Sequence, residues 1–205
     1  MRKLVVATTN RGKIKEIAML LDSAPVSLMT LADFPDVSPP DETGETFAEN
    51  ARLKALFYAA HTGELTVAED SGLEVDALDG APGVESARFG GADATYPQKF
   101  ALLYDALGQK KMASPATARF VCALALAKGR ELLFEARGTV EGAIAPEPRG
   151  TGGFGYDPIF FYPPYGCTLA EAGDRKTAVS HRGEAFRKLR AYLTTYIAEH
   201  AEHAE

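Results

Sequence analysis

Hydrophobic and polar residues alternate near the start of the chain in a way that predicts a strand, a loop, a helix and a second strand. Residues 4–7 and 26–31 are mostly apolar, which is typical of buried strands. Between them, apolar residues from Ile14 to Leu21 recur at helical spacing, and residues 8–13 before this helix are polar. The polar stretch therefore lies where a strand ends and a helix starts.

A longer helix is predicted over residues 43–61. Thr43 or Thr46 is a suitable N-cap, and Thr46 has Glu49 three residues later, as a capping box requires. Gly63 follows the last apolar residues and predicts the C-terminal end of the helix. Both ends of this helix are therefore marked by residues that stabilise helix ends.

The rest of the chain mixes strands and helices without strict alternation, which indicates a mixed α/β sheet covered by helices. The turn 128–130 lies between two alternating segments and predicts a β-hairpin. Ala123, Ala125 and Ala127 share one face of the first arm, and their small size predicts a closely packed helix there. The further predicted strands are 65–68, 73–78, 116–127 and 131–140, and the further helices are 96–107 and 183–198.

Composition and charge narrow the class of protein. The 205 residues suit one large domain or two fused lobes, and 46% apolar with 24% charged residues is ordinary for a soluble protein. A net charge of −6 argues against a nucleic-acid binder or a protein of anionic membranes. The N-terminus lacks a signal peptide, and no apolar run approaches the ~20 residues that span a bilayer. The two cysteines lack metal-ligand spacing, so we expect a cytoplasmic protein.

The polar stretch 8–13 is the first candidate for chemistry. The positive end of a helix dipole and free N–H groups point toward such a turn, so a phosphate is a natural ligand. It is not a Walker loop, because Ala7 stands where the motif needs a glycine. The alternative is an ordinary strand-to-helix turn with a solvated Lys13.

Two acidic pairs are the second candidate. Asp41 and Glu42 form one pair and Glu69 and Asp70 the other, each at the boundary of a predicted element. Mg²⁺ accepts one or two carboxylates together with water and phosphate oxygens, and an aspartate beside it can deprotonate an attacking water. The alternative is surface charge and turn chemistry.

A glycine-rich segment, 150–155, formally matches the dinucleotide-binding pattern G-x-G-x-x-G. Prolines precede it instead of a strand, and Tyr-Asp-Pro follows instead of a helix, so its context rejects that function. Phe154 and Tyr156 offer flat faces on which a base could stack, although such aromatic residues are more often part of a core.

Three cationic or titratable residues, Lys176, His181 and Arg182, precede or begin the last predicted helix. Such a cluster could contact a phosphate or the edge of a purine. The alternative is a capped helix start, with Ser180 as the N-cap and exposed charges around it.

Taken in order, these segments resemble one family, the inosine-triphosphate pyrophosphatases (XTP/dITP diphosphatases). The resemblance spans nearly the whole chain, and agreement in six ordered segments is far beyond chance. The family commonly has two aspartates where this chain has Glu69 and Asp70. The matching segments are 7–13, 42–51, 68–73, 81–88, 152–160 and 180–183.

The resemblance implies a role for each matching residue. Asp70 would be the catalytic base and a Mg²⁺ ligand, with Glu42 as the second metal ligand and Lys54 assisting the phosphate loop. Whether Asp41 or Glu69 also meets the metal stays open. The residues implied to bind the triphosphate are Thr8, Thr9, Asn10, Arg11, Gly12 and Lys13. The residues implied to contact the rest of the substrate are Ser71, Phe154, Gly155, Tyr156, Asp157, Lys176, His181 and Arg182.

The resemblance also implies an architecture and an activity. The expected architecture is α/β: one two-lobed domain over residues 1–205, with a long mixed β-sheet dividing the lobes and an active-site cleft between them. The expected partners are Mg²⁺, a purine nucleoside triphosphate such as ITP, dITP or XTP, and a second copy in a homodimer. The competing hypotheses are a catalytically silent nucleotide-binding module and a dinucleotide-dependent oxidoreductase.

Overall fold

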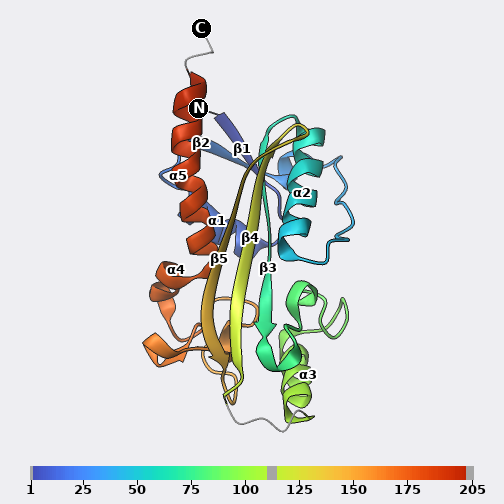
Figure 1. Cartoon of the computed structure of the whole chain (residues 1–205), viewed down its shortest axis with the longest axis vertical. Helices are drawn as coiled ribbons and strands as arrows, with labels where there is room; N and C mark the ends of the chain where they lie inside the picture. The colour runs from blue at the N-terminus through green and yellow to red at the C-terminus, as the bar shows by residue number, and fades with distance from the viewer. Residues whose placement is uncertain (1, 110–114, 202–205) are drawn as a thin grey trace. The chain divides into compact units, whose positions relative to one another are not determined.

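The computed structural model describes residues 2–109 and 115–201, so Met1, 110–114 and 202–205 of the predicted domain lie outside the described residues (Figure 1). The described helices are α1 (Arg11–Leu20), α2 (Phe47–Thr62), α3 (Tyr96–Gln109), α4 (Lys176–Val179) and α5 (His181–Ala201). The described strands are β1 (Arg2–Val6), β2 (Val26–Thr30), β3 (Leu65–Val75), β4 (Thr117–Lys128), β5 (Glu131–Ile144), β6 (Phe160–Tyr162) and β7 (Cys167–Thr168). Within this described part, no helix is long and apolar enough to cross a bilayer.

The strands form one mixed sheet in the order β2-β1-β3-β4-β5-β6-β7. β1 runs parallel to both β2 and β3, with Leu4 opposite Leu28 and Leu65. β6 is antiparallel to both β5 and β7. The mixed α/β sheet is therefore confirmed. The hairpin is confirmed as well, because β4 and β5 are neighbours in the sheet and only residues 129–130 join them.

The chain divides into two compact units. The first unit comprises Met1–Asp70, Cys122–Gly138 and Arg182–Glu205, and the second comprises Ser71–Val121 and Thr139–His181. The strands β3, β4 and β5 contribute residues to both units. The single two-lobed domain and the cleft remain predictions.

The strands β1, β3 and β4 bury both of their faces within the first unit, whereas β2 and β5 are less buried there. One face packs on α1 and α5 through apolar side chains, among them Cys122, Leu124 and Leu126 of β4. On the other face, Ala125 and Ala127 contact alanines of α2, which confirms the predicted close approach of a helix. Figure 1 shows α5 and α2 on opposite sides of the strands. Because strand side chains alternate, adjacent residues of one strand serve different helices.

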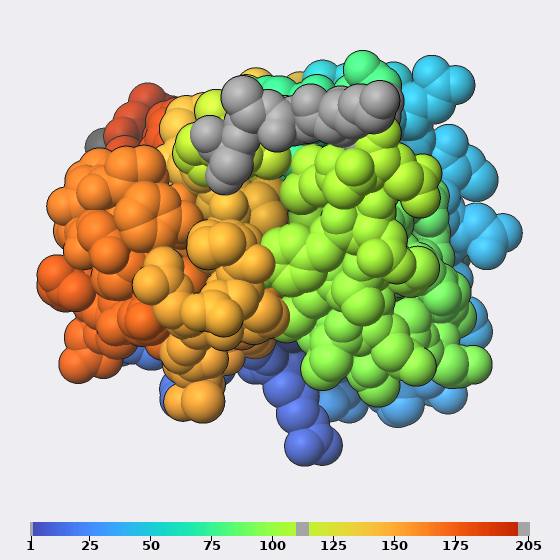
Figure 2. All heavy atoms as spheres, turned by 90° about the horizontal axis from the view of Figure 1, so that it is seen from below, coloured from blue at the N-terminus to red at the C-terminus, as the bar shows by residue number. Residues whose placement is uncertain are grey.

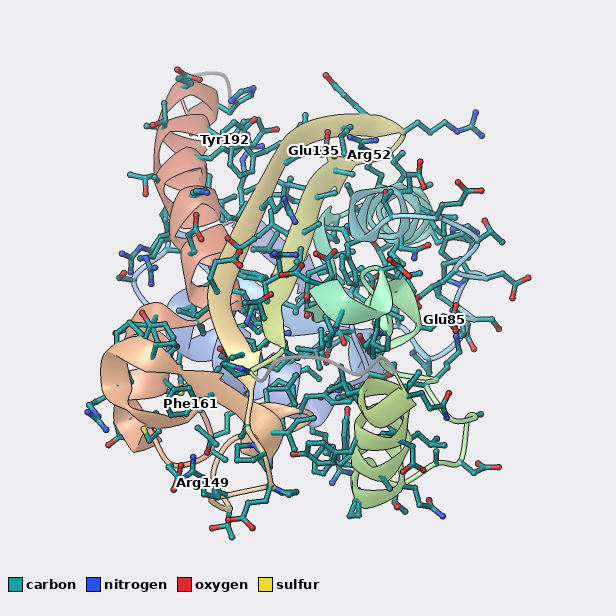
Figure 3. The ribbon with its side chains drawn as sticks, turned by 60° about the horizontal axis from the view of Figure 1, so that its bottom comes forward. Arg52, Glu85, Glu135, Arg149, Phe161 and Tyr192 are labelled. Carbon is teal, nitrogen blue, oxygen red and sulfur yellow. The ribbon has the colours of Figure 1, made fainter. Side chains whose placement is uncertain are left out.

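The ends of α2 follow the sequence signals. Thr46 Oγ1 accepts from Glu49 N, and the Glu49 carboxylate accepts from Thr46 N, so the predicted capping box is confirmed. Gly63 ends the helix with φ +69°, a conformation that glycine adopts without strain. Arg52 of α2 also forms an ion pair with Glu135 of β5 (Figure 3).

Two predicted boundaries are wrong. Two strands were predicted around Glu69 and Asp70, but β3 runs without a break from Leu65 to Val75. Both carboxylates are buried beside cationic partners, so the polar residues remain inside the strand. The first helix begins at Arg11, two residues before the predicted loop ends.

The second unit has its own apolar core. Phe100 and Leu103 of α3 pack against buried residues that include Ile159 and Phe160. Tyr104 donates a hydrogen bond of 2.9 Å to the Ala145 carbonyl. Figure 2 shows one face of this unit, with α3 beside the segment that follows β5. That segment carries the aromatic and charged residues expected to contact a base.

Candidate active site

The predicted phosphate loop ends in the N-cap of α1. Asn10 Oδ1 accepts from the backbone N–H groups of Gly12 (2.9 Å) and Lys13 (3.2 Å), and Asn10 N donates to Thr8 Oγ1 (3.2 Å). Two amides that we expected to be free therefore bond to Asn10. Thr9, Asn10 and Arg11 are exposed, so the loop is open to solvent.

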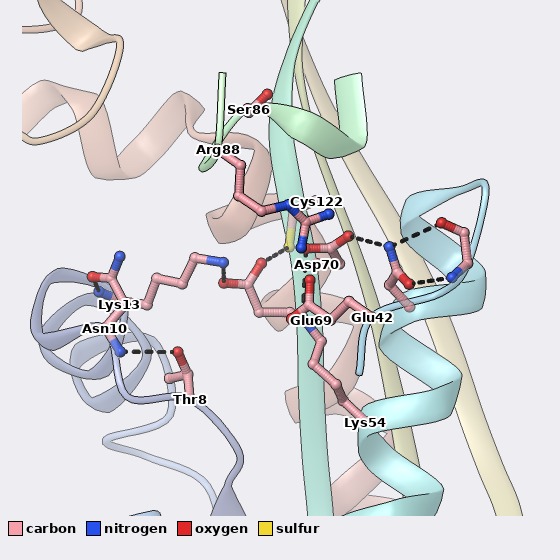
Figure 4. Close-up of polar contacts among 12 residues, drawn as sticks. Thr8, Asn10, Lys13, Glu42, Lys54, Glu69, Asp70, Ser86, Arg88 and Cys122 are labelled. Atoms are coloured by element: carbon pink, nitrogen blue, oxygen red, sulfur yellow. Dashed lines mark hydrogen bonds and ion pairs between the residues drawn. The ribbon is translucent and has the colours of Figure 1, made fainter. Parts of the chain in front are cut away.

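Lys13 extends from α1 toward β3, where its ammonium lies 3.0 Å from Glu69 Oε1 (Figure 4). The Lys13 side chain is 17% exposed, whereas that of Glu69 is 2% exposed. Solvent can therefore reach the Lys13 side chain but not the Glu69 carboxylate.

Glu69 is a buried carboxylate with three kinds of partner. Besides Lys13, Oε1 accepts from Arg182 Nη2 (3.1 Å) and Nε (3.3 Å), and Oε2 accepts from the Cys122 thiol (3.3 Å). Burial alone would raise the pKa of Glu69, but the charges of Arg182 and Lys13 outweigh it and hold that pKa well below its usual range. Burial raises the pKa of Cys122, so the thiol keeps the proton that it donates.

Arg182 was expected to contact substrate, and the structure places its guanidinium on carboxylates of the first unit. Its Nη1 lies 2.8 Å from Glu16 Oε2, in addition to the contacts with Glu69, and the residue is 1% exposed. Burial would lower the pKa of Arg182, but Glu69 and Glu16 raise it. These contacts join α5 to α1 and β3, and the role of Arg182 toward substrate stays a prediction.

Asp70 faces α2, on the opposite side of β3 from Glu69. Its Oδ2 accepts from Asn50 Nδ2 (3.2 Å), and its Oδ1 lies 3.5 Å from Lys54 Nζ. Asn50 is itself held by Gly44, whose N–H donates to Asn50 Oδ1 (2.8 Å). Burial raises the pKa of Asp70 above its ordinary value, against the opposing effects of Lys54 and Lys13.

Lys54 also binds a second carboxylate, that of Glu42, at 2.9 Å. Burial would lower the pKa of the ammonium, but Asp70 and Glu42 together raise it. The structure therefore brings together three residues that the family resemblance assigned to one site.

The donor set fits the expected Mg²⁺ in its chemistry. Glu42 and Asp70 converge on one ammonium, so the two carboxylates carry one more negative charge than Lys54 neutralises. The described residues contain no group of three or more histidine, cysteine or acidic side chains that would hold a metal alone. Mg²⁺ usually takes only one or two carboxylates and completes its shell with water and substrate phosphates. Glu42 and Asp70 suit such a site.

The residues expected to flank a base form a compact cluster in the second unit. Lys176 Nζ lies 2.6 Å from Asp157 Oδ2 and 4.7 Å from the centroid of the Phe154 ring. The same Asp157 oxygen accepts from Phe154 N at 2.8 Å. Gly153 has φ +70°, and a Cβ there would collide with Asp157 Oδ2, so this glycine serves the Asp157 contact.

Tyr156 is buried and donates from its hydroxyl to the Ser86 carbonyl (2.9 Å). Its ring meets that of Tyr96 edge to face at 5.4 Å, and Tyr96 also lies next to Gly155. His181 stacks on Phe120 with ring centroids 5.0 Å apart. Tyr156 is thus a core residue of this unit, as the alternative interpretation held.

The predicted site residues fall into two groups. The loop 8–13 lies in the first unit with Glu42, Lys54, Asp70 and Arg182, while Ser71, residues 154–157, Lys176 and His181 lie in the second unit. The predicted cluster of Lys176, His181 and Arg182 is therefore divided between the units. The sequence did not predict roles for Asn50, Glu16 and Tyr96. Of these, only Asn50 could have been found, because it lies in segment 42–51, which carries part of the family resemblance.

Fold and site together define an α/β protein in which buried carboxylates and lysines adjoin a strand-to-helix loop, an arrangement suited to a polyphosphate and a divalent cation. The model of the Ham1 family matches residues 4–192. The chain therefore belongs to the Ham1 family.

Individual relatives agree with this assignment. A protein of Exiguobacterium sp. named dITP/XTP pyrophosphatase is 49% identical over 95% of this chain and 98% of the relative. The structure of a HAM1 protein from Coxiella burnetii matches with a TM-score of 0.88 and 39% identity, covering 95% of this chain and all of that one (100%). A nucleoside-triphosphatase (dITP/XTP pyrophosphatase) structure from Mycobacterium abscessus matches at 0.73 and 40% identity, over 91% and 98% of the two chains. The family resemblance seen in the sequence is confirmed.

Proposed function

We propose that this protein hydrolyses ITP, dITP and XTP to the nucleoside monophosphate and pyrophosphate. The names of its relatives support this substrate class. The observation that carries the proposal is Asp70, a buried carboxylate held by Asn50 and Lys54 with a raised pKa. Such a group is suited to accept a proton from water.

In the proposed reaction, a water molecule attacks the α phosphorus and gives its proton to an Asp70 oxygen. The bond between that phosphorus and the oxygen bridging to the β phosphate breaks, and pyrophosphate leaves with the electron pair. Asn50 and Lys54 keep the Asp70 carboxylate in place. Holding the base before the reaction removes an orientational cost.

Lys13, Lys54 and the exposed loop would bind the triphosphate and stabilise the charge that develops on leaving pyrophosphate. Glu42 and Asp70 would hold Mg²⁺, which when bound neutralises phosphate charge and lowers the pKa of a bound water. Lys54 would therefore bind the triphosphate while it contacts the carboxylates of both proposed metal ligands, Glu42 and Asp70. Magnesium dependence is tested by assaying turnover after removal of divalent cations and again after adding Mg²⁺.

Base selection is assigned to Lys176, Asp157 and Phe154. Hypoxanthine and xanthine have an oxygen acceptor at position 6, where adenine has an amino donor, and a lysine ammonium can only donate. Removing that donor should narrow the preference for ITP over ATP. The test compares kcat/KM for both nucleotides in wild type and Lys176→Met, and an unchanged ratio would contradict this assignment.

The experiment for the whole proposal separates the products. Pyrophosphate and orthophosphate are measured individually, with ITP as substrate and no added pyrophosphatase. Pyrophosphate as the first product supports the proposal, whereas orthophosphate with a nucleoside diphosphate contradicts it. A protein that binds ITP without any turnover would instead be the catalytically silent module.

The oxidoreductase hypothesis receives no support from the fold. The glycine-rich segment is followed by a short 3₁₀ turn (Asp157–Ile159) and not by the helix of a dinucleotide site. The homodimer and the cytoplasmic location remain part of the proposal. Sedimentation analysis of the purified chain tests the dimer.

A further inference from the structure

Glu69 joins two substrate-binding candidates that lie far apart in the sequence. Its Oε1 contacts Lys13, from the α1 end of the phosphate loop, and Arg182, from the start of α5. Figure 4 shows Glu69 with Lys13 on one side of β3, next to Asp70 in the strand. In the proposed reaction Asp70 and Lys13 each have a role, whereas Glu69 has none.

Burial determines what Glu69 can do. The Glu69 side chain is 2% exposed, and both of its oxygens have partners, so it is poorly placed to touch a nucleotide itself. The Lys13 side chain is 17% exposed and can meet a phosphate. Any effect of Glu69 on the reaction must therefore pass through a residue that it holds.

Lys13 needs such a restraint. A lysine side chain carries its ammonium on a flexible four-carbon stem. Without a partner, the position of that ammonium is therefore poorly defined. Glu69 is fixed in the middle of β3 and anchored from behind by Arg182, which Glu16 also holds. A rigid strand thus supplies a fixed acceptor for a flexible cation.

We propose that Glu69 is a positioning residue, which holds the Lys13 ammonium in the place where it stabilises the charge on leaving pyrophosphate. This inference rests on the proposed function.

The test is a double-mutant cycle of Glu69→Gln and Lys13→Met, with kcat and KM for ITP measured at saturating Mg²⁺. Because Glu69 acts through Lys13, Glu69→Gln should lower kcat/KM about tenfold in the wild-type background, mainly through kcat. In the Lys13→Met background the same change should alter kcat/KM less than about twofold. Equal losses in the two backgrounds would overturn the proposal.

Cys122→Ala is the matched control, because it removes the partner of Glu69 Oε2 and leaves the Lys13 contact in place. It should change kcat/KM by less than about twofold. Thermal unfolding identifies variants that lose the fold. Should Glu69→Gln be unfolded, Glu69→Asp replaces it in the cycle, and partial activity with the same dependence on Lys13 supports the proposal.

The wild-type protein distinguishes failure of this inference from failure of the proposed function. If wild type releases no pyrophosphate from ITP, the proposed function fails. The same four proteins are then compared for binding of inorganic tripolyphosphate by calorimetry. An effect of Glu69→Gln on that affinity that vanishes with Lys13→Met supports the positioning role, and an additive effect or none overturns it.

Discussion

The two faces of β3 in the first unit place adjacent carboxylates in different electrostatic surroundings. On the face toward α1 and α5, Glu69 meets two cations, Lys13 and Arg182, and its pKa is lowered. On the face toward α2, Asp70 shares the ammonium of Lys54 with Glu42, and burial raises its pKa against the opposing charges of Lys54 and Lys13.

This difference shows that the neighbouring charges, and not burial alone, set the protonation of each carboxylate. Both carboxylates are nearly inaccessible to water, with 3% of Glu69 and 7% of Asp70 exposed. Glu69, whose cations outweigh the effect of burial, remains a fixed charge, whereas Asp70, whose cations do not, can accept a proton. The first three predictions below test this contrast, and the last concerns the start of α2.

Asp70→Asn should nearly abolish turnover and leave the fold intact. An amide keeps the shape of the side chain but loses the charge that binds a metal and the basicity that takes a proton. A general base typically contributes about 10²–10⁴-fold to the rate. The measurement is kcat for ITP, with circular dichroism to check the fold. Asp22→Asn, at an exposed carboxylate, is the control, and retention of most activity in Asp70→Asn would refute the assignment.

Glu69→Gln should destabilise the fold by about 3 kcal/mol, because it removes one of the two carboxylates that hold the buried Arg182 guanidinium. For a chain of this size, that corresponds to a Tm lower by about 6–12 °C. Urea unfolding and calorimetry measure the effect. Glu135→Gln, at a more exposed ion pair with Arg52, is the control and should cost less than about 1 kcal/mol. Equal losses for the two would contradict the contrast.

Acid should protonate Asp70 while Glu69 stays ionised. With its pKa raised, Asp70 should take up its proton above the usual aspartate value of about 3.9, and Glu69 should remain charged below the usual glutamate value of about 4.3. The stability that Glu69 contributes is present above its unfolded-state pKa and is lost only as pH falls through the lowered folded-state pKa. A window of pH therefore exists in which the chain is folded but Asp70 cannot accept a proton.

Carboxyl ¹³C NMR without divalent cations measures both titrations. Asp70→Asn and Glu69→Gln assign the two signals. The reverse order of protonation would show that burial, and not the neighbouring charges, controls both groups.

Thr46→Ala should have the smallest effect of the four. It removes the hydroxyl that accepts from Glu49 N at the start of α2, which typically costs about 1 kcal/mol. Thr46→Ser, which keeps the hydroxyl, is the matched control. Chemical unfolding measures the loss, and equal stability of the two variants would show that this cap contributes little.

The sequence predicts most clearly what depends on near neighbours. The capping box of Thr46 and Glu49 and the helix end at Gly63 involve contacts within a few residues, and they are confirmed. Asn10 is a local signal of the same kind, because it caps α1, although the predicted loop 8–13 continues past it.

Long-range pairing could not be read in the same way. Glu69 and Arg182 are 113 positions apart, and nothing in either local segment indicates that they form a buried ion pair. For the same reason Asp70 appeared to interrupt a strand that in fact continues, since its partners Asn50 and Lys54 come from another element. The family resemblance, and not periodicity, assigned Glu42, Lys54 and Asp70 to one site.

The alanine face of the first unit links sequence variation in the core to the position of the base. Asn50 and Lys54 are one turn apart on α2, and that helix lies on Ala125 and Ala127 of β4 through its own Ala51 and Ala55. A larger side chain at any of these four alanines would displace α2 outward and carry both partners away from Asp70. These alanines have no functional group, yet their substitution should lower turnover. A mutational scan of activity should find them as intolerant of substitution as the residues that contact the substrate.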